Sequence, residues 1–146
     1  MTLTQAFANT KVTVDKSLQQ IEGLMEVHGI REQRYTHLRP EDPAAAEGEV
    51  AQGTIAYEFV RHGKEDNERR GVRIVVRYQP TMIRVDRRTM VKRKVKGTTA
   101  QMAGRALFWF LKAKFDSIDY GIEEFDVAFM PHLITQLGPT FAERPD

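Results

Sequence analysis

A short basic segment near the middle of the chain holds the residues with the clearest chemical potential. Residues 84–96 contain one acid, Asp86, and seven cations: Arg84, Arg87, Arg88, Lys92, Arg93, Lys94 and Lys96. Closely spaced lysines and arginines neutralise phosphates and release counterions, the main source of sequence-independent nucleic-acid affinity. The segment runs into a predicted helix, whose free N–H groups would add to the positive potential. The pattern predicts a phosphate-binding site; a solvated charged loop is the alternative.

Two residues of the following helix extend this candidate site. Arg105 and Trp109 lie one turn apart, and Trp109 falls on or next to the polar side of the helix. A tryptophan beside cations can stack on a base or anchor a protein partner; burial under another part of the chain is the alternative. The predicted nucleic-acid-binding residues are Arg87, Arg88, Lys92, Arg93, Lys94, Lys96, Arg105 and Trp109.

The remaining residues give little support to catalysis. The 146-residue chain has no cysteine, which excludes thiolate ligands and cysteine nucleophiles. Its two serines, Ser17 and Ser117, stand outside any nucleophile motif, its four histidines are scattered, and it has no phosphate-loop or dinucleotide fingerprint. We therefore expect a non-enzymatic protein without metal or cofactor.

The element that must position the basic segment is a helix predicted over residues 98–121. Thr98 or Thr99 can cap its start, and Gly121 can close its end in a left-handed conformation. Its apolar residues recur at a spacing of three and four and so share one face: Ala103, Leu107, Phe110, Leu111, Phe115 and Ile118. This stripe needs an apolar sheet to cover it.

Alternating residues predict that sheet. Strands are expected at 31–39, 54–61 and 72–79, with a short edge strand at 81–85, while helices are expected at 13–29 and 125–129. Arg73 and Arg77 would face outward and pair with Glu58 across strands. Short links imply antiparallel pairing. The sequence therefore predicts an α+β fold, in which a three- to four-stranded antiparallel sheet packs on the long helix, with an N-terminal helix and a short C-terminal helix.

We expect one domain over residues 1–146, with a loose arm at 1–12, an acidic loop at 40–53 and an irregular tail at 138–146. No apolar run approaches the roughly 20 residues of a membrane span, and the N-terminus lacks the layout of a signal peptide. These features predict a cytoplasmic protein. The order of helix, strands and helix also parallels double-stranded-RNA-binding domains, in topology alone.

Several segments resemble a set of small proteins encoded by bacteriophages and mobile elements. They are KVTVDKSLQQIEGLMEVHG, AYEFV, GVRIVVRYQP and RALFWFLKAKFDSIDYGIEEFDVAFMPHLI. The positions that match the pattern of that set are Arg105, Ala106, Leu107, Lys112, Ala113, Lys114, Gly121, Phe125 and Phe129. The match fails in the loops 40–53 and 62–71 and in the tail. The resemblance implies a role in phage or mobile-element biology inside a bacterial host, and it brings no catalytic residues.

Two functions follow as hypotheses. The first is a phage or mobile-element accessory protein that binds DNA or RNA through the basic segment, without catalysis. The alternative is a protein-binding module that inhibits or modulates a host enzyme such as RNA polymerase or a nuclease. The acidic loop 40–53 and an exposed Trp109 would suit such an interface.

Overall fold

A computed structural model describes residues 7–40, 52–63 and 68–134 of the chain. The predicted tail, most of the predicted acidic loop and half of the predicted N-terminal arm lie outside these residues. The helices and strands follow in the order α1 (Val14–Val27), β1 (Glu32–Leu38), β2 (Gly53–Arg61), β3 (Arg70–Tyr78), β4 (Thr81–Val85), β5 (Lys92–Lys96), α2 (Ala100–Asp119), α3 (Phe125–Ala128) and the 3-10 turn η4 (Met130–His132). The predicted α+β class is confirmed.

Helix α2 is the predicted central helix, and its ends have the predicted signals. The hydroxyl of Thr99 accepts a hydrogen bond from the backbone N–H of Met102 at 3.2 Å. Gly121 closes the other end at a φ of +75°, which a residue with a Cβ rarely adopts. Leu107, Leu111 and Phe115 are buried, as the apolar stripe predicts.

Helix α1 packs lengthwise against α2. Thr13 caps its start and Gly29, at a φ of +76°, ends it. Small residues let the two helices approach closely, since a Cβ added to Gly104 would lie 3.1 Å from Cβ of Ser17. Ser17 and Gly104 therefore mark a point of close approach between the two helices.

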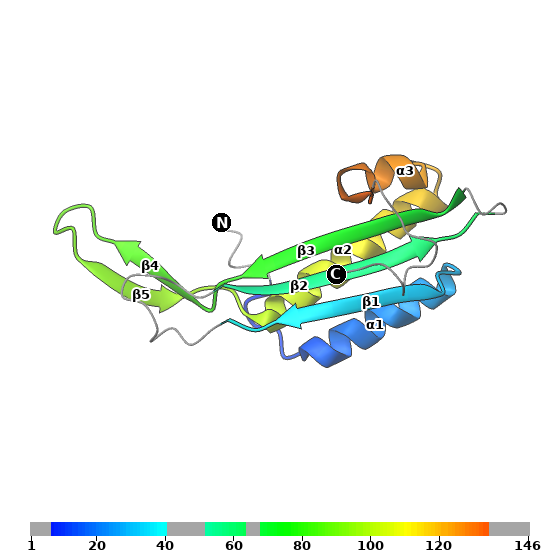
Figure 1. The fold of residues 1–146 in the computed structure, drawn as a ribbon. Coiled ribbons are helices and arrows are strands. Elements are labelled where there is room, and N and C mark those ends of the chain that lie inside the picture. The colour runs from blue at the N-terminus through cyan, green and yellow to red at the C-terminus, as the bar shows by residue number, and fades with distance from the viewer. Residues whose placement is uncertain (1–6, 41–51, 64–67, 135–146) are drawn as a thin grey trace.

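The main sheet has the order β1-β2-β3, with antiparallel pairing throughout. Figure 1 shows α1 and α2 on one face of this sheet. Alternate residues of β2 and β3 face these helices and are buried: Ile55, Tyr57, Phe59, Val72 and Ile74. Buried residues of α1 and α2 belong to the same cluster: Ile21, Met25, Leu107 and Leu111. The core therefore lies between the sheet and the helices.

An ion-pair row crosses the opposite face of the sheet. Glu58 of β2 lies between Arg34 of β1, at 3.4 Å, and Arg73 of β3, at 3.6 Å. The register places the three residues directly opposite one another, so the predicted pairing of Arg73 with Glu58 is confirmed. Arg77, which was expected to pair in the same way, lies opposite Thr54 instead.

The predicted edge strand at 81–85 exists as β4, but it does not join the main sheet. It pairs with β5 in a separate two-stranded sheet. The main sheet therefore has three strands, and residues 84–85 and 92–96 of the basic segment lie in the two strands of the separate sheet. Figure 1 shows this hairpin projecting beyond the end of the main sheet and away from the helices.

Candidate nucleic-acid interface

The predicted cations lie on a projecting hairpin formed by β4, β5 and the turn between them (residues 81–96), which we call the basic hairpin. Its base is tied by three hydrogen bonds. The N–H of Gly97 donates to the carbonyl of Pro80 at 2.9 Å, and the N–H of Thr98 donates to the carbonyl of Gln79 at 2.8 Å. The N–H of Gln79 donates in turn to the hydroxyl of Thr98 at 2.9 Å. A Cβ at Gly97 would overlap the Gln79 carbonyl, so glycine is required for this close approach.

Cations occupy both faces of the basic hairpin. The pairing is Thr81 with Lys96, Met82 with Val95, Ile83 with Lys94, Arg84 with Arg93 and Val85 with Lys92. Directly opposed residues share a face and neighbours along a strand alternate. Lys92, Lys94 and Lys96 therefore line one face, while Arg84 and Arg93 lie on the other. A ribbon charged on both faces can meet phosphates on two sides at once.

This arrangement is electrostatically unfavourable in the free protein. Arg84 lies directly opposite Arg93, and like charges in such a cross-strand pair destabilise a sheet. An isolated two-stranded hairpin is also only marginally stable in water. Because the fold gains little from crowding these charges, a bound polyanion is the partner that would relieve their repulsion.

The turn of the basic hairpin is held by Asp86. Its carboxylate accepts a hydrogen bond from the N–H of Arg88 at 2.8 Å, and its carbonyl accepts one from the N–H of Met90 at 2.7 Å. Its own N–H donates to the carbonyl of Val91 at 3.0 Å. Met90 adopts a φ of +57°. The only acid of the segment therefore shapes the turn, which presents Arg87 and Arg88.

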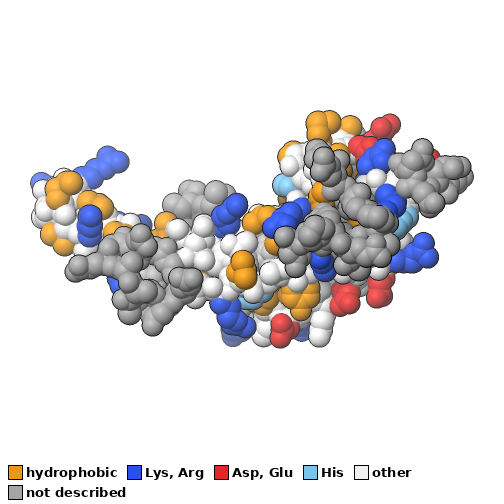
Figure 2. All heavy atoms as spheres, in the orientation of Figure 1, with side chains coloured by type: hydrophobic (Ala, Val, Ile, Leu, Met, Phe, Trp, Pro, Cys, Tyr) orange, Lys and Arg blue, Asp and Glu red, His pale blue; other side chains and the backbone are white. Residues whose placement is uncertain are grey.

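Charge is segregated between the basic hairpin and the rest of the chain. The hairpin carries seven cations and one acid, a net charge of +6, whereas the chain as a whole carries +2. The remaining sequence, with 15 basic and 19 acidic residues, therefore carries −4. Figure 2 shows basic side chains at the far end of the hairpin, mixed with hydrophobic ones. The positive charge of the described residues is thus most concentrated on the hairpin.

Arg105 lies in the body and not beside the hairpin cations. Only 8% of its surface is exposed, and its guanidinium donates to the hydroxyl of Ser17 at 2.9 Å and to the side-chain oxygen of Gln20. It also covers the ring of Phe108, with Cζ 4.9 Å from the centroid. Burial lowers the pKa of Arg105 below its ordinary value. These contacts join α1 to α2, so we leave Arg105 out of the proposed interface.

Trp109 is half-exposed on α2, at 50% of its surface, with its ring packed edge-on against Phe108 at 5.4 Å. It lies nine residues into the helix, which corresponds to about 14 Å along the axis. The basic hairpin extends away from α2 (Figure 1). The helix N-terminus is likewise separate from most of the cations, because only Lys96 is close to it in sequence and Thr99 already caps it.

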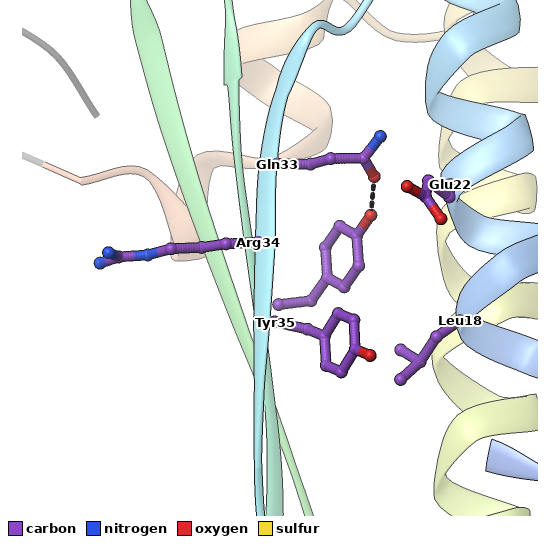
Figure 3. Close-up of a pocket in the computed structure, with 6 residues that line it drawn as sticks. Leu18, Glu22, Gln33, Arg34 and Tyr35 are labelled. Atoms are coloured by element: carbon purple, nitrogen blue, oxygen red, sulfur yellow. Dashed lines mark hydrogen bonds between the residues drawn. The ribbon is translucent and has the colours of Figure 1, made fainter. Parts of the chain in front are cut away.

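A hollow of 260 Å³ opens between α1 and β1 (Figure 3). The hydroxyl of Tyr57 donates to the side-chain oxygen of Gln33 inside it. Burial, reinforced by Glu22 and Tyr35, raises the pKa of Tyr57, so its phenol stays protonated. The Arg34 side chain points away from the hollow in Figure 3, toward its partner Glu58. Nothing in this lining forms a nucleophile with an activating base.

Within the described ranges, no cluster of three histidine or acidic residues has the arrangement of a metal site. The helices in these ranges are also too short or too polar to cross a bilayer. No family model, curated protein or solved structure matches the chain.

Proposed function

We propose that this protein is a non-enzymatic nucleic-acid-binding accessory protein, and that the basic hairpin is its binding element. The observation that carries the proposal is the placement of seven cations on a ribbon that projects beyond the main sheet and away from the helices. The resemblance to small phage and mobile-element proteins would place this role in phage or mobile-element biology.

The charges give the proposal a quantitative form. Each phosphate neutralised on B-form DNA contributes about −0.9 to the slope of log K against log salt concentration. If all seven cations engage, the slope reaches about −6. A protein that binds in this way loses most of its affinity between low and moderate salt, whatever the base sequence.

The test replaces one face of the hairpin. Lys92, Lys94 and Lys96 are changed together to glutamine, which keeps a polar side chain at each position and removes three charges. We expect the salt slope to become less steep by about 3 and the melting temperature to stay nearly constant, since solvated charges contribute little to stability. Binding is measured by fluorescence anisotropy with single- and double-stranded DNA and RNA at several salt concentrations.

A matched control removes three charges from the body: Lys11, Lys16 and Arg31, all exposed, are changed to glutamine. This variant should keep the wild-type salt slope. Equal slopes in the two triple variants would show that net charge, and not the hairpin, drives binding. Failure of the wild-type protein to bind any of the four nucleic acids at low salt would refute the proposal.

A protein-binding role is the second candidate, and the exposed Trp109 favours it. Its indole is half-exposed, and its neighbours on the helix surface, Ala106 and Ala113, are small and exposed. A partner protein could therefore pack against the indole as an apolar anchor. In this case a host protein would be retained after nuclease treatment and lost on Trp109→Ala. Nucleic-acid binding through the hairpin would be unaffected by that change.

A further inference from the structure

The tip of the basic hairpin has an unusual residue at its most constrained position. Met90 has a φ of +57°, a left-handed conformation that is costly for a side chain with a Cβ. Hairpin turns normally place glycine or asparagine there. Met90 is also 70% exposed, so burial of its side chain does not offset the cost. Strained residues of this kind concentrate at functional sites.

The surroundings of Met90 combine apolar and basic groups. Val91 and Val85 are exposed beside it, at 59% and 41% of their surfaces. Arg87 and Arg88 precede it in the turn, and Lys92 follows. An apolar point flanked by cations has the composition of the wedges with which some minor-groove proteins unstack base pairs and bend the duplex.

We propose that the basic hairpin binds duplex DNA by inserting Met90 between neighbouring base pairs from the minor groove, so that the duplex bends at that step. This inference rests on the proposed nucleic-acid function and names its substrate. The phosphates on the two walls of the groove are then met by the lysine face and the arginine face of the hairpin. Met90 lies in the turn at the end of the ribbon, and its side chain is exposed there.

An anionic membrane surface is the other ligand that attracts basic and apolar groups together. A flat surface meets only one face or the tip of the ribbon, and would leave the cations of the opposite face unused. The distribution of Lys92, Lys94 and Lys96 on one face and Arg84 and Arg93 on the other therefore favours a groove.

The critical variant is Met90→Asn. Asparagine tolerates the left-handed conformation, so the turn is retained while the apolar wedge is removed. Met90→Leu keeps an apolar wedge, and Met130→Asn, at a methionine that is 63% exposed on η4, is the matched control. Bending is measured by energy transfer between dyes on the two ends of a short duplex. Affinity is compared for an intact duplex and one with a central mismatch, whose bases are already easier to unstack.

We expect the wild-type protein, Met90→Leu and Met130→Asn to bend the duplex and to bind the mismatched duplex roughly tenfold more tightly, because part of the unstacking cost is avoided. Met90→Asn should keep the salt slope but lose the bend and the mismatch preference. Unchanged bending by Met90→Asn, or tighter binding to duplex RNA without bending, would refute the wedge while leaving nucleic-acid binding intact. Binding to phosphatidylserine vesicles but to no nucleic acid would refute both proposals.

Discussion

At the scale of single residues, Arg105 shows that two cations close in sequence can have different roles. Its guanidinium is held by neutral acceptors on α1, whereas Arg93 lies on the exposed hairpin. Removing Arg105 leaves Ser17 without its charged donor and takes a side chain out of the helix interface. We expect Arg105→Ala to lower the free energy of unfolding by about 1–3 kcal/mol, as measured by urea denaturation.

The reciprocal variant is Arg93→Ala, which should leave stability nearly unchanged and make the salt slope of DNA binding less steep by about 1. Arg105→Ala should not alter that slope. If it instead flattened the slope and spared stability, the interface would extend onto α2, and Arg105 would belong to it as the sequence pattern suggests.

At the scale of elements, the last residue of β3 packs closely on a glycine at the start of β2. The ring of Tyr78 lies over Gly53, directly opposite in the register, where a Cβ would overlap it. Tyr78 is buried, and its hydroxyl shares a hydrogen bond of 2.6 Å with Nε2 of His37 on β1. We expect Gly53→Ala to lower the free energy of unfolding by about 1–3 kcal/mol, because the ring must move and give up that contact.

Gly23 provides the contrasting substitution. It lies within α1, and a Cβ there would meet nothing within 4 Å. Gly23→Ala should raise the free energy of unfolding by about 0.5–1 kcal/mol through helix propensity. If Gly53→Ala and Gly23→Ala changed the free energy of unfolding equally, the ring of Tyr78 would have to move aside without cost. Thermal or chemical denaturation measures both changes.

The helices and the three strands of the main sheet could be predicted because each has a strong local signal. Thr99 and Gly121 delimit α2, and the alternation of Ile55, Tyr57 and Phe59 defines the buried face of β2. The core prediction holds for Leu107, Leu111 and Phe115, while Phe110 and Ile118 are only partly buried. Strong periodicity is therefore enough to place the layers of this fold.

The basic hairpin could not be predicted in the same way. Strand β5 has one apolar residue, Val95, so it lacks the alternation that identifies a half-buried strand. Its turn contains neither glycine nor asparagine, the residues that usually signal a hairpin. The sequence shows that the cations are clustered. Their division between two faces depends on the strand pairing, and the role of Asp86 depends on the turn; only the structure shows these.

At the scale of the whole molecule, stability and charge are assigned to different parts of the chain. The core lies between the main sheet and α1, α2 and α3, and no residue of β4 or β5 belongs to it. The net charge of the hairpin is opposite in sign to that of the rest of the chain. The concentration of cations on the hairpin would orient the protein as it approaches a polyanion, with the hairpin leading.

The separation can be tested by removing the hairpin. Replacing residues 81–96 with Asn-Gly places a two-residue turn between Pro80 and Gly97, whose backbone hydrogen bond already closes the base. Because the core is untouched, we expect a cooperative unfolding transition within a few degrees of the wild-type melting temperature. Nucleic-acid binding should be lost at every salt concentration, since the seven clustered cations are removed. An unfolded variant would show that the hairpin stabilises the body, and retained binding would place the interface on the body.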